Sequence, residues 1–583
     1  MNLSTTIKSI QDIMRKDDGV DGDAQRIGQL TWMLFLKIYD QREDEWEDDA
    51  RDKKKRFKSV LPEECRWRNW AAYKDGKPQI AATELIHYVN TQVFPKLKDL
   101  PADGSPRAKV VREVFIDSNN YMKTGTLMLG VIEKLDEAIN FHDLKSRAQL
   151  GDIYEQILND LRSAGNAGEF YTPRSITSFM VQMVNPSLKK RETVLDPACG
   201  TGGFLTSTID HFTKQLTKKS SAEDKKAIEE CIWGIEKKQL PHLLCVTNML
   251  LHGIDVPSQI EHRNTLAKGW NDWSFNERVD CVITNPPFGG MEDDGVGNDY
   301  PSDIRTRETA DMFLTLIVKK LLKEKGRGAV VLPDGTLFGE GVKAKVKELL
   351  LRECNLHTII RLPNGVFSPY TGIKTNLLFF TKGKQTETIW YYEHRYPEGV
   401  KSYSKTKPLR LDELQTIAEW WGKESNGFAD RVETDQAWKI DFKTLKEVAE
   451  AKRKPHDIEA ERLENEASVL NQELVQQRSA LKKESQAVKK KKLQQALDEA
   501  QFNYDSLVQK AKDERATGDR HYWPIFNLDI KNPRAVEEES HDPNKLLKKY
   551  QDLQKEIEET EKLLHGELAA ALGHHDASSE VAS

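Results

Sequence analysis

The stretch VLDPACGTGGF, residues 194–204, joins a short apolar run to a glycine-rich turn. It predicts a β-strand that ends at Asp196 and a helix that begins after the glycines. Gly200, Gly202 and Gly203 let the backbone approach a ligand closely, and the helix N-terminus offers free N–H groups to a carboxylate. By itself such a turn also suits dinucleotides and phosphates, although no Walker lysine follows these glycines.

The next predicted strand narrows the kind of ligand. CIWGIEKK, residues 231–238, places Glu236 at the carboxyl end of that strand. An acidic side chain in this position can accept hydrogen bonds from both hydroxyls of a ribose. The two segments together therefore predict a site for a ribose-containing ligand at the carboxyl edge of a sheet.

A third segment, VITNPPFGG at 282–290, ends a buried strand with two prolines. Pro286 and Pro287 have a fixed φ and no backbone donor, so they cannot continue a central strand and instead form a rigid corner. Ligands of open α/β sheets bind beyond the carboxyl ends of the strands, so we expect Asn285 and Phe288 to face a site. Taken alone, the segment is equally compatible with an ordinary strand-ending turn.

Short β-branched runs alternate with segments of helical period between about 190 and 390. The runs are ETVLD, CIWGIE, VDCVITN, GAVVLP, HTIIRLP and NLLFFT. This alternation is typical of an α/β fold with a parallel sheet. Apolar residues at helical spacing over 314–322, followed by LKEKGRG, predict a helix that packs on the sheet and ends at the lysines and glycine.

Helical patterns flank the predicted sheet on both sides. The expected domains are an all-helical domain at 1–145, the sheet domain at 146–395, a mixed connector at 396–456, a coiled-coil-like segment at 457–515, and a connector with a final helix at 516–583. The first heptad pattern runs through Leu463, Ala467, Leu470, Leu474, Gln477, Leu481, Glu484 and Val488, and the second through Leu546, Tyr550, Leu553, Ile557, Thr560 and Leu564. The pattern at 457–515 fits either docking on a partner or folding back as an antiparallel hairpin.

Composition argues against several classes of protein. Lys plus Arg number 87 against 93 Asp plus Glu, a net charge of −6, so any DNA contact must be local or shared with a partner. The six cysteines form no CxxC pair, which argues against a zinc site or disulfide framework and fits the cytoplasm. The start lacks a signal peptide, and no apolar run approaches a membrane span. The lysine run at 489–492 fits DNA contact, although such runs are most often solvated helix faces.

Several motifs carry a family resemblance. FYTP at 170–173, DPACGTGGF and NPPF occur in this order, accompanied by FLKIYD near 35, GDIYEQIL at 151, LPDGTLF at 332, LPNGVF and YTGIKTNLLFF within 362–380, and FNLDIKNP at 526. Over most of its length the chain resembles the modification subunit of type I restriction-modification systems. This subunit is a DNA methyltransferase that makes N6-methyladenine. NPPF alone is shared with protein-glutamine and RNA methyltransferases.

The resemblance implies a Rossmann-like methyltransferase sheet that binds S-adenosyl-L-methionine, and it assigns cofactor-binding roles by position. The first cofactor segment comprises Glu169, Phe170, Tyr171, Thr172, Pro173 and Arg174. The glycine turn supplies Asp196, Gly200, Thr201, Gly202 and Gly203, with Glu236 on the ribose. Asn264, in RNTL after the third strand, stands where this class often holds the cofactor adenine, although a polar residue at a strand end is commonly only a cap.

The same resemblance makes Asn285, Pro286, Pro287 and Phe288 the catalytic segment. An exocyclic adenine amine is a poor nucleophile because its lone pair is delocalised into the ring. The side-chain carbonyl of Asn285 and the backbone carbonyl of Pro286 can accept the two N6 hydrogens and localise that pair. The base must leave the double helix, and Phe288 offers a face on which it can stack.

The resemblance also implies an assembly on double-stranded DNA. In this family C-terminal helices dock onto a separate specificity subunit, two modification subunits embrace one specificity subunit, and two restriction subunits join them in the complete enzyme. Consistent with this, no second folded domain able to read bases is evident after the sheet. Two alternatives stay open on the sequence alone: a protein-glutamine or RNA methyltransferase, and a non-catalytic assembly subunit.

Overall fold

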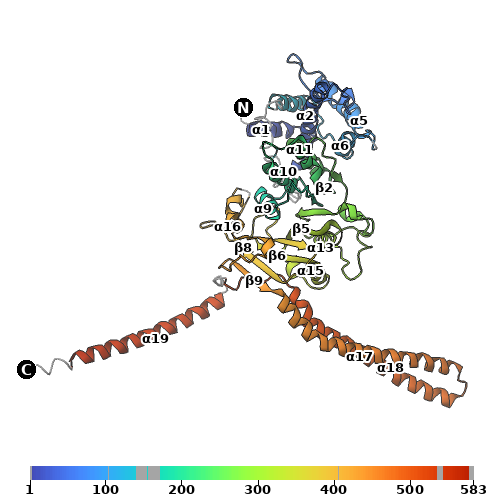
Figure 1. Cartoon of the computed structure of the whole chain (residues 1–583), viewed down its shortest axis with the longest axis vertical. Helices are drawn as coiled ribbons and strands as arrows, with labels where there is room; N and C mark the ends of the chain where they lie inside the picture. The colour runs from blue at the N-terminus through green and yellow to red at the C-terminus, as the bar shows by residue number, and fades with distance from the viewer. Residues whose placement is uncertain are drawn as a thin grey trace, which may run out of the picture. The chain divides into compact units, whose positions relative to one another are not determined.

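The computed structural model describes residues 3–102, 104–138, 154, 171–404, 406–534 and 543–576. It divides into two units, residues 1–530 and 531–583, which are described separately below. In the first unit, Figure 1 shows a group of N-terminal helices, a central sheet with helices packed on it, and a long pair of helices that leaves the sheet.

The N-terminal part of the first unit is helical, as the sequence predicts. Its helices are α1 (Leu3–Met14), α2 (Asp23–Asp52), α3 (Trp67–Trp70), α4 (Ala82–Tyr88), α5 (Phe94–Lys98), α6 (Pro106–Phe115) and α7 (Gly125–Ala138). The apolar run in α2 forms the centre, where Trp32 and Phe35 are fully buried. This part is fixed to the next by Gln239, whose Nε2 donates to Ser118 Oγ at 2.8 Å and to the Val114 carbonyl.

A nine-stranded sheet forms the middle of the unit. Its strands are β1 (Val194–Asp196), β2 (Ile232–Glu236), β3 (Ile260–His262), β4 (Val279–Thr284), β5 (Leu322–Pro333), β6 (Cys354–Arg361), β7 (Thr375–Lys382), β8 (Thr388–Glu393) and β9 (Ala437–Asp441). They lie in the order β3-β2-β1-β4-β5-β7-β6-β8-β9. The expected α/β class is confirmed, and all six quoted runs form strands.

Helices cover both faces of the sheet and bury it on each side. One face packs against α9 (Arg174–Val184), α10 (Gly203–Gln215), α11 (Ala222–Cys231), α12 (Gln239–Leu251) and α16 (Gln415–Trp420). The other packs against α13 (Thr309–Leu316) and α15 (Val342–Glu353), while a short helix, α14 (Asp334–Phe338), follows β5. Successive side chains of a strand enter opposite cores: Phe379 lies in the first core and Phe380 in the second.

The sheet is mixed, whereas the sequence predicts a parallel one. β7, the NLLFFT run, lies between β5 and β6 and is antiparallel to both. β6 and β7 are joined by residues 362–374, which contain no helix. A parallel neighbour requires a crossover connection, usually through a helix, and this connection contains no helix and returns the chain antiparallel.

The predicted end of the 314–322 helix is also wrong. The helical stretch ends at Leu321, and LKEKGRG opens β5 instead of closing the helix. Leu322 pairs with Val279 of β4, and the register then shifts so that Arg327 pairs with Cys281. The strand absorbs the extra residues in a bulge at Lys325, which has a φ of 65°. The polar residues of LKEKGRG, whose pattern is typical of a helix end, therefore form the irregular first part of β5.

β9 and two long helices occupy the region after the quoted strands. β9 lies within the stretch expected as a connector, and its Trp438 stacks on Tyr391 of β8 with centroids 5.3 Å apart. α17 (Phe442–Lys483) follows β9 directly, so it begins earlier than 457 and contains Pro455 in its interior. α18 (Ala487–Tyr522) returns beside it as an antiparallel hairpin. Of the two arrangements left open, the hairpin is the one observed.

The hairpin seam follows the predicted heptad over part of its length. Leu463, Ala467 and Leu474 are buried, whereas Val488 is 75% exposed and lies outside the seam. Val488 departs from the pattern because α17 ends at Lys483 and the chain reverses before it, which breaks the register of the repeat.

The second unit contains α19 (Pro543–Asp576). Apolar side chains recur along it at helical spacing and are exposed: Leu547, Tyr550, Leu553, Ile557, Leu563, Leu564 and Leu568. Within the described ranges, none of the helices of either unit is long and apolar enough to cross a membrane.

Gly202 offers a direct test of the turn before α10. It has a φ of 84°, and a Cβ built there would lie 2.8 Å from Cys245 Sγ. Gly253 has a φ of 88° but no atom within 4 Å of its Cβ position, so it carries the same backbone strain without the clash. We expect Gly202→Ala to lower the free energy of unfolding by roughly 1–3 kcal/mol more than Gly253→Ala. Calorimetric unfolding of both variants checks this, and equal losses would contradict it.

Candidate active site

Three parallel strands bring the predicted motifs to one edge of the sheet. β1 lies between β2 and β4, so the glycine turn, Glu236 and Asn285 all follow the carboxyl ends of neighbouring strands. Thr284 Oγ1 donates to Asp196 Oδ1 at 2.6 Å and joins the ends of β4 and β1. Asp196 Oδ1 also accepts from the backbone N–H of Ala198, so this side chain shapes the turn.

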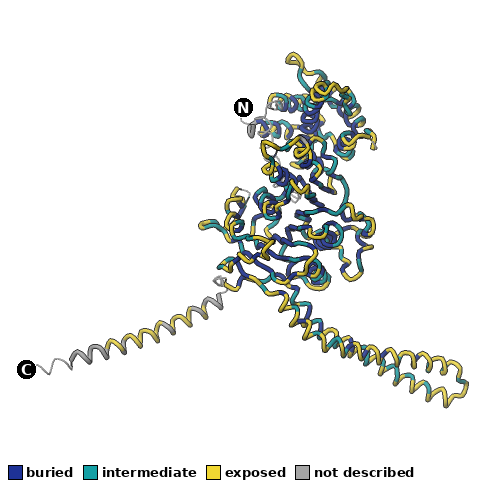
Figure 2. Tube along the Cα trace, viewed as in Figure 1, coloured by how far each residue is buried: buried dark blue, intermediate teal, exposed yellow. Residues whose placement is uncertain are grey.

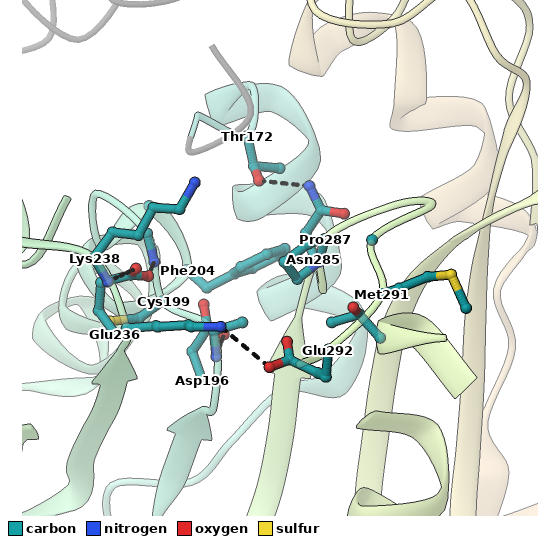
Figure 3. Close-up of a pocket in the computed structure, with 16 residues that line it drawn as sticks. Thr172, Asp196, Cys199, Phe204, Glu236, Lys238, Asn285, Pro287, Met291 and Glu292 are labelled. Carbon is teal, nitrogen blue, oxygen red and sulfur yellow. Dashed lines mark hydrogen bonds and ion pairs between the residues drawn. The ribbon is translucent and has the colours of Figure 1, made fainter. Parts of the chain in front are cut away.

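A cavity of about 220 Å³ lies at this edge (Figure 3). Its lining combines the three motifs with residues that the sequence did not single out. The lining residues are Thr172, Asp196, Ala198, Cys199, Gly200, Gly203, Phe204, Glu236, Lys237, Lys238, Asn285, Pro287, Gly290, Met291, Glu292 and Thr309.

Glu236 is held rigidly at one side of the cavity. Its Oε2 accepts from the backbone N–H of Gly200 at 2.9 Å, and its Oε1 accepts from that of Lys238 at 2.7 Å. Burial raises the pKa of Glu236, and these two N–H donors act in the opposite direction. Each carboxylate oxygen has further acceptor capacity, so the side chain is oriented by the backbone and can still accept from a diol.

Asn285 lies across the cavity with its amide oriented. Its Nδ2 donates to Thr172 Oγ1 at 3.1 Å, the contact drawn dashed in Figure 3. Its Oδ1 is buried and, within the described part of the chain, has no hydrogen-bond partner. A buried acceptor without a donor costs free energy, and this carbonyl belongs to a residue that lines the cavity.

Asn264 takes a supporting position and does not line the cavity. Its Oδ1 accepts from Leu266 N at 3.0 Å, as a cap, and its Nδ2 donates to Glu292 Oε2 at 3.0 Å. Lys237 Nζ donates to the same Glu292 oxygen at 3.1 Å. Glu292 is therefore a cavity residue missed from the sequence. The sequence contains one signal for this role: Glu292 is an acidic residue shortly after NPPF, in a stretch whose pattern is typical of a loop.

The remaining predicted residues surround the cavity or lie outside the described residues. Arg174 donates to Ser207 Oγ at 3.4 Å and to Thr206, and so contacts α10. Thr201 accepts from Asn248 Nδ2 through its carbonyl, at 3.1 Å. Tyr171, Pro173 and Pro286 are buried, while Pro287 is exposed and lines the cavity. Glu169 and Phe170 lie outside the described residues.

Phe288 lies beside the cavity lining. It is partly buried and makes an edge-on contact with Phe367, with ring centroids 6.1 Å apart. Phe367 belongs to the LPNGVF segment that follows β6, and the sequence gives it no role. Phe288 follows Asn285 by three residues, and its ring packs against the buried ring of Phe367.

The described residues contain no group of three or more His, Cys, Asp or Glu side chains placed to hold a metal ion. All six cysteines are buried and free. Burial raises the pKa of Cys281 to about 12 and that of Cys231 to about 11, which keeps both thiols protonated.

Comparison with known proteins places the chain in a family. The model for N-6 DNA Methylase matches residues 145–465, and the model for the HsdM N-terminal domain matches residues 3–135. The EcoEI type I restriction enzyme methylase subunit of Escherichia coli is 49% identical over 574 residues, which cover 98% of this chain and 99% of that one.

Two solved structures agree in fold. A modification subunit of a putative type I restriction enzyme from Vibrio vulnificus YJ016 is 39% identical with a TM-score of 0.64, covering 76% of this chain and 93% of its own. A chain from a study of complex assembly and conformational transition in the type I R-M system is 30% identical with a TM-score of 0.67, covering 97% and 98%. The chain therefore belongs to the N-6 DNA methylases and, among them, to the methylase subunits of type I restriction enzymes, the adenine-specific DNA methyltransferases of restriction-modification systems.

Proposed function

We propose that this modification subunit transfers a methyl group from S-adenosyl-L-methionine to N6 of adenine, in a duplex DNA sequence that a separate specificity subunit reads. The observation that carries the proposal is the buried, unpartnered carbonyl of Asn285, which shares a cavity with the oriented carboxylate of Glu236. The assembly acts on cellular DNA, and we place it in the cytoplasm.

The cavity residues fit S-adenosyl-L-methionine, which supplies an electrophilic methyl group when bound. Glu236 would accept from the ribose hydroxyls, because both of its oxygens are already aimed by backbone donors. Gly200 and Gly203 line the cavity without side chains, so their backbone can approach the cofactor. Glu292 lines the same cavity and is held by Lys237 and Asn264.

Asn285 would act on the adenine amine. Thr172 fixes the amide nitrogen, so Oδ1 faces the substrate and accepts one N6 hydrogen, while the Pro286 carbonyl accepts the other. These acceptors hold the nitrogen lone pair away from the ring and stabilise the positive charge that develops during transfer. Phe288 would stack on the flipped base, supported by Phe367.

Selection of the target would fall to the partner subunits. We propose that α19 docks on the specificity subunit through its exposed apolar side chains, including Leu553, Ile557 and Leu564. Two copies of this chain would join one specificity subunit, and restriction subunits would complete the assembly. Exposed apolar residues at helical spacing are typical of a helix that packs on another helix.

Glu236→Ala should weaken binding of S-adenosyl-L-methionine by roughly one to two orders of magnitude, because the loss of one charge-assisted partner costs about 1.5–3 kcal/mol. Isothermal titration calorimetry of the isolated chain measures this. Glu261→Ala is the matched control, since Glu261 lies on β3 and does not line the cavity. Unchanged cofactor affinity in Glu236→Ala would contradict the ribose role.

Asn285→Ala should leave cofactor affinity nearly intact and lower the rate of methyl transfer by roughly 10²–10³, the scale for losing one positioned electrostatic partner. Thr172→Val should lower the rate less, since the amide stays but loses its orienting acceptor, and Thr172→Ser should restore it. Incorporation of labelled methyl groups into target DNA by the assembled complex is the assay. A full rate for Asn285→Ala would refute its role, and label in protein or RNA would indicate a different substrate.

Removal of residues 543–583 should spare cofactor binding, since every cavity residue lies before 310. It should abolish assembly with the specificity subunit and thus sequence-specific methylation, because each buried leucine contributes roughly 1.5–3 kcal/mol. The combined variant L553Q/I557Q/L564Q should behave like the truncation, whereas K548Q/K555Q/K562Q on the same helix should assemble normally. Gel filtration with the specificity subunit tests this, and an intact complex of the truncated chain would refute the docking role.

A further inference from the structure

The closed end of the α17–α18 hairpin carries a concentrated positive charge. We name residues 478–492 the lysine tip: it contains Arg478, Lys482, Lys483 and Lys489 to Lys492 against one acid, Glu484, a net charge of +6. All seven basic side chains are exposed. The whole chain has a net charge of −6, so the sign of the charge is reversed here.

Nearer the sheet, some charged side chains of the hairpin are paired across its two helices. Near the sheet, Arg453 pairs with Asp519 at 3.1 Å, Arg515 with Glu464 at 2.8 Å and His456 with Glu514 at 2.7 Å, each across the two helices. The six lysines of the tip form no ion pair with any described residue. Like charges on adjacent helical turns destabilise a helix, so this cluster is unfavourable unless an external anion neutralises it.

The tip also lies far from the cavity. α17 starts at the end of the edge strand β9 and has 42 residues, which at 1.5 Å per residue span about 63 Å. Figure 1 shows the hairpin leaving the sheet, and Figure 2 shows exposed residues at its closed end. A polyanion that reaches both the cavity and the tip must be long and continuous, as duplex DNA is.

We propose that the lysine tip binds the phosphate backbone of duplex DNA that flanks the methylated site. The proposal rests on the DNA-methylating function above and adds a second, sequence-independent contact to it. At about 3.4 Å per base pair, the reach of the hairpin corresponds to roughly 18 base pairs. The contact therefore falls outside the target sequence and adds affinity without adding specificity.

The test compares two quadruple variants in the complex with the specificity subunit. The tip variant is K489Q/K490Q/K491Q/K492Q, and the control K452Q/K454Q/K510Q/K512Q removes the same charge from exposed lysines nearer the sheet. Equilibrium affinity is measured over a salt series on target duplexes with flanks of about 5 or about 40 base pairs. This readout requires no methyl transfer, so it stands apart from the proposed catalytic chemistry.

On the long duplex, the tip variant should bind at least about tenfold more weakly than the unsubstituted chain, and the slope of log affinity against log salt should fall by roughly 2–4. On the short duplex, affinity and methylation should match those of the unsubstituted chain. Equal long-duplex affinity and salt slope for the tip variant and the unsubstituted chain would overturn the proposal, as would an equal loss in the control. Retained DNA affinity with lost subunit assembly would also overturn it and would assign the tip to an acidic protein surface.

Discussion

The hydrogen bond from Thr284 Oγ1 to Asp196 Oδ1 is the contact on which the arrangement of the active site depends. Thr284 immediately precedes Asn285, and Asp196 stands at the start of the glycine turn, so one bond of 2.6 Å fixes both motifs relative to each other. Burial raises the pKa of Asp196 to about 7, while the bonds from Thr284 and Ala198 lower it. The free energy of burying this carboxyl is thus offset by the same contacts that align the strands.

A second contact orients the Asn285 side chain once the strands are aligned. Asn285 Nδ2 donates to Thr172 Oγ1, which leaves the amide oxygen Oδ1 unpartnered. Thr172 comes from the segment before α9 and lines the cavity itself. Thr172 therefore both lines the cavity and holds the Asn285 amide in place.

The sequence predicted the strands and the carboxyl-edge motifs because both depend on local patterns: Glu236 and Asn285 follow apolar runs and must lie at the strand ends. It could not predict contacts between distant segments. One partner of Glu292 is Asn264, 28 residues earlier, and neither stretch has a pattern that reports the pairing. Strand direction and bulges depend on connections and neighbours, so no local pattern reports the antiparallel β7 or the irregular start of β5. α17 begins before 457 and contains Pro455 in its interior.

Because β9 continues directly into α17, the hairpin is attached to the edge of the sheet without a linker. Asp441 is the last residue of β9 and the N-cap of α17, and its Oδ1 accepts from the backbone N–H of Thr444 at 3.0 Å. No linker residues separate the strand from the helix. A rotation of about 5° at this junction moves the far end by roughly 5 Å, given a rise of 1.5 Å per helical residue. Force applied at the tip is therefore delivered to the edge of the methyltransferase sheet, and lengthening both helices by one heptad would shift the point of application by about 10 Å without altering the catalytic fold.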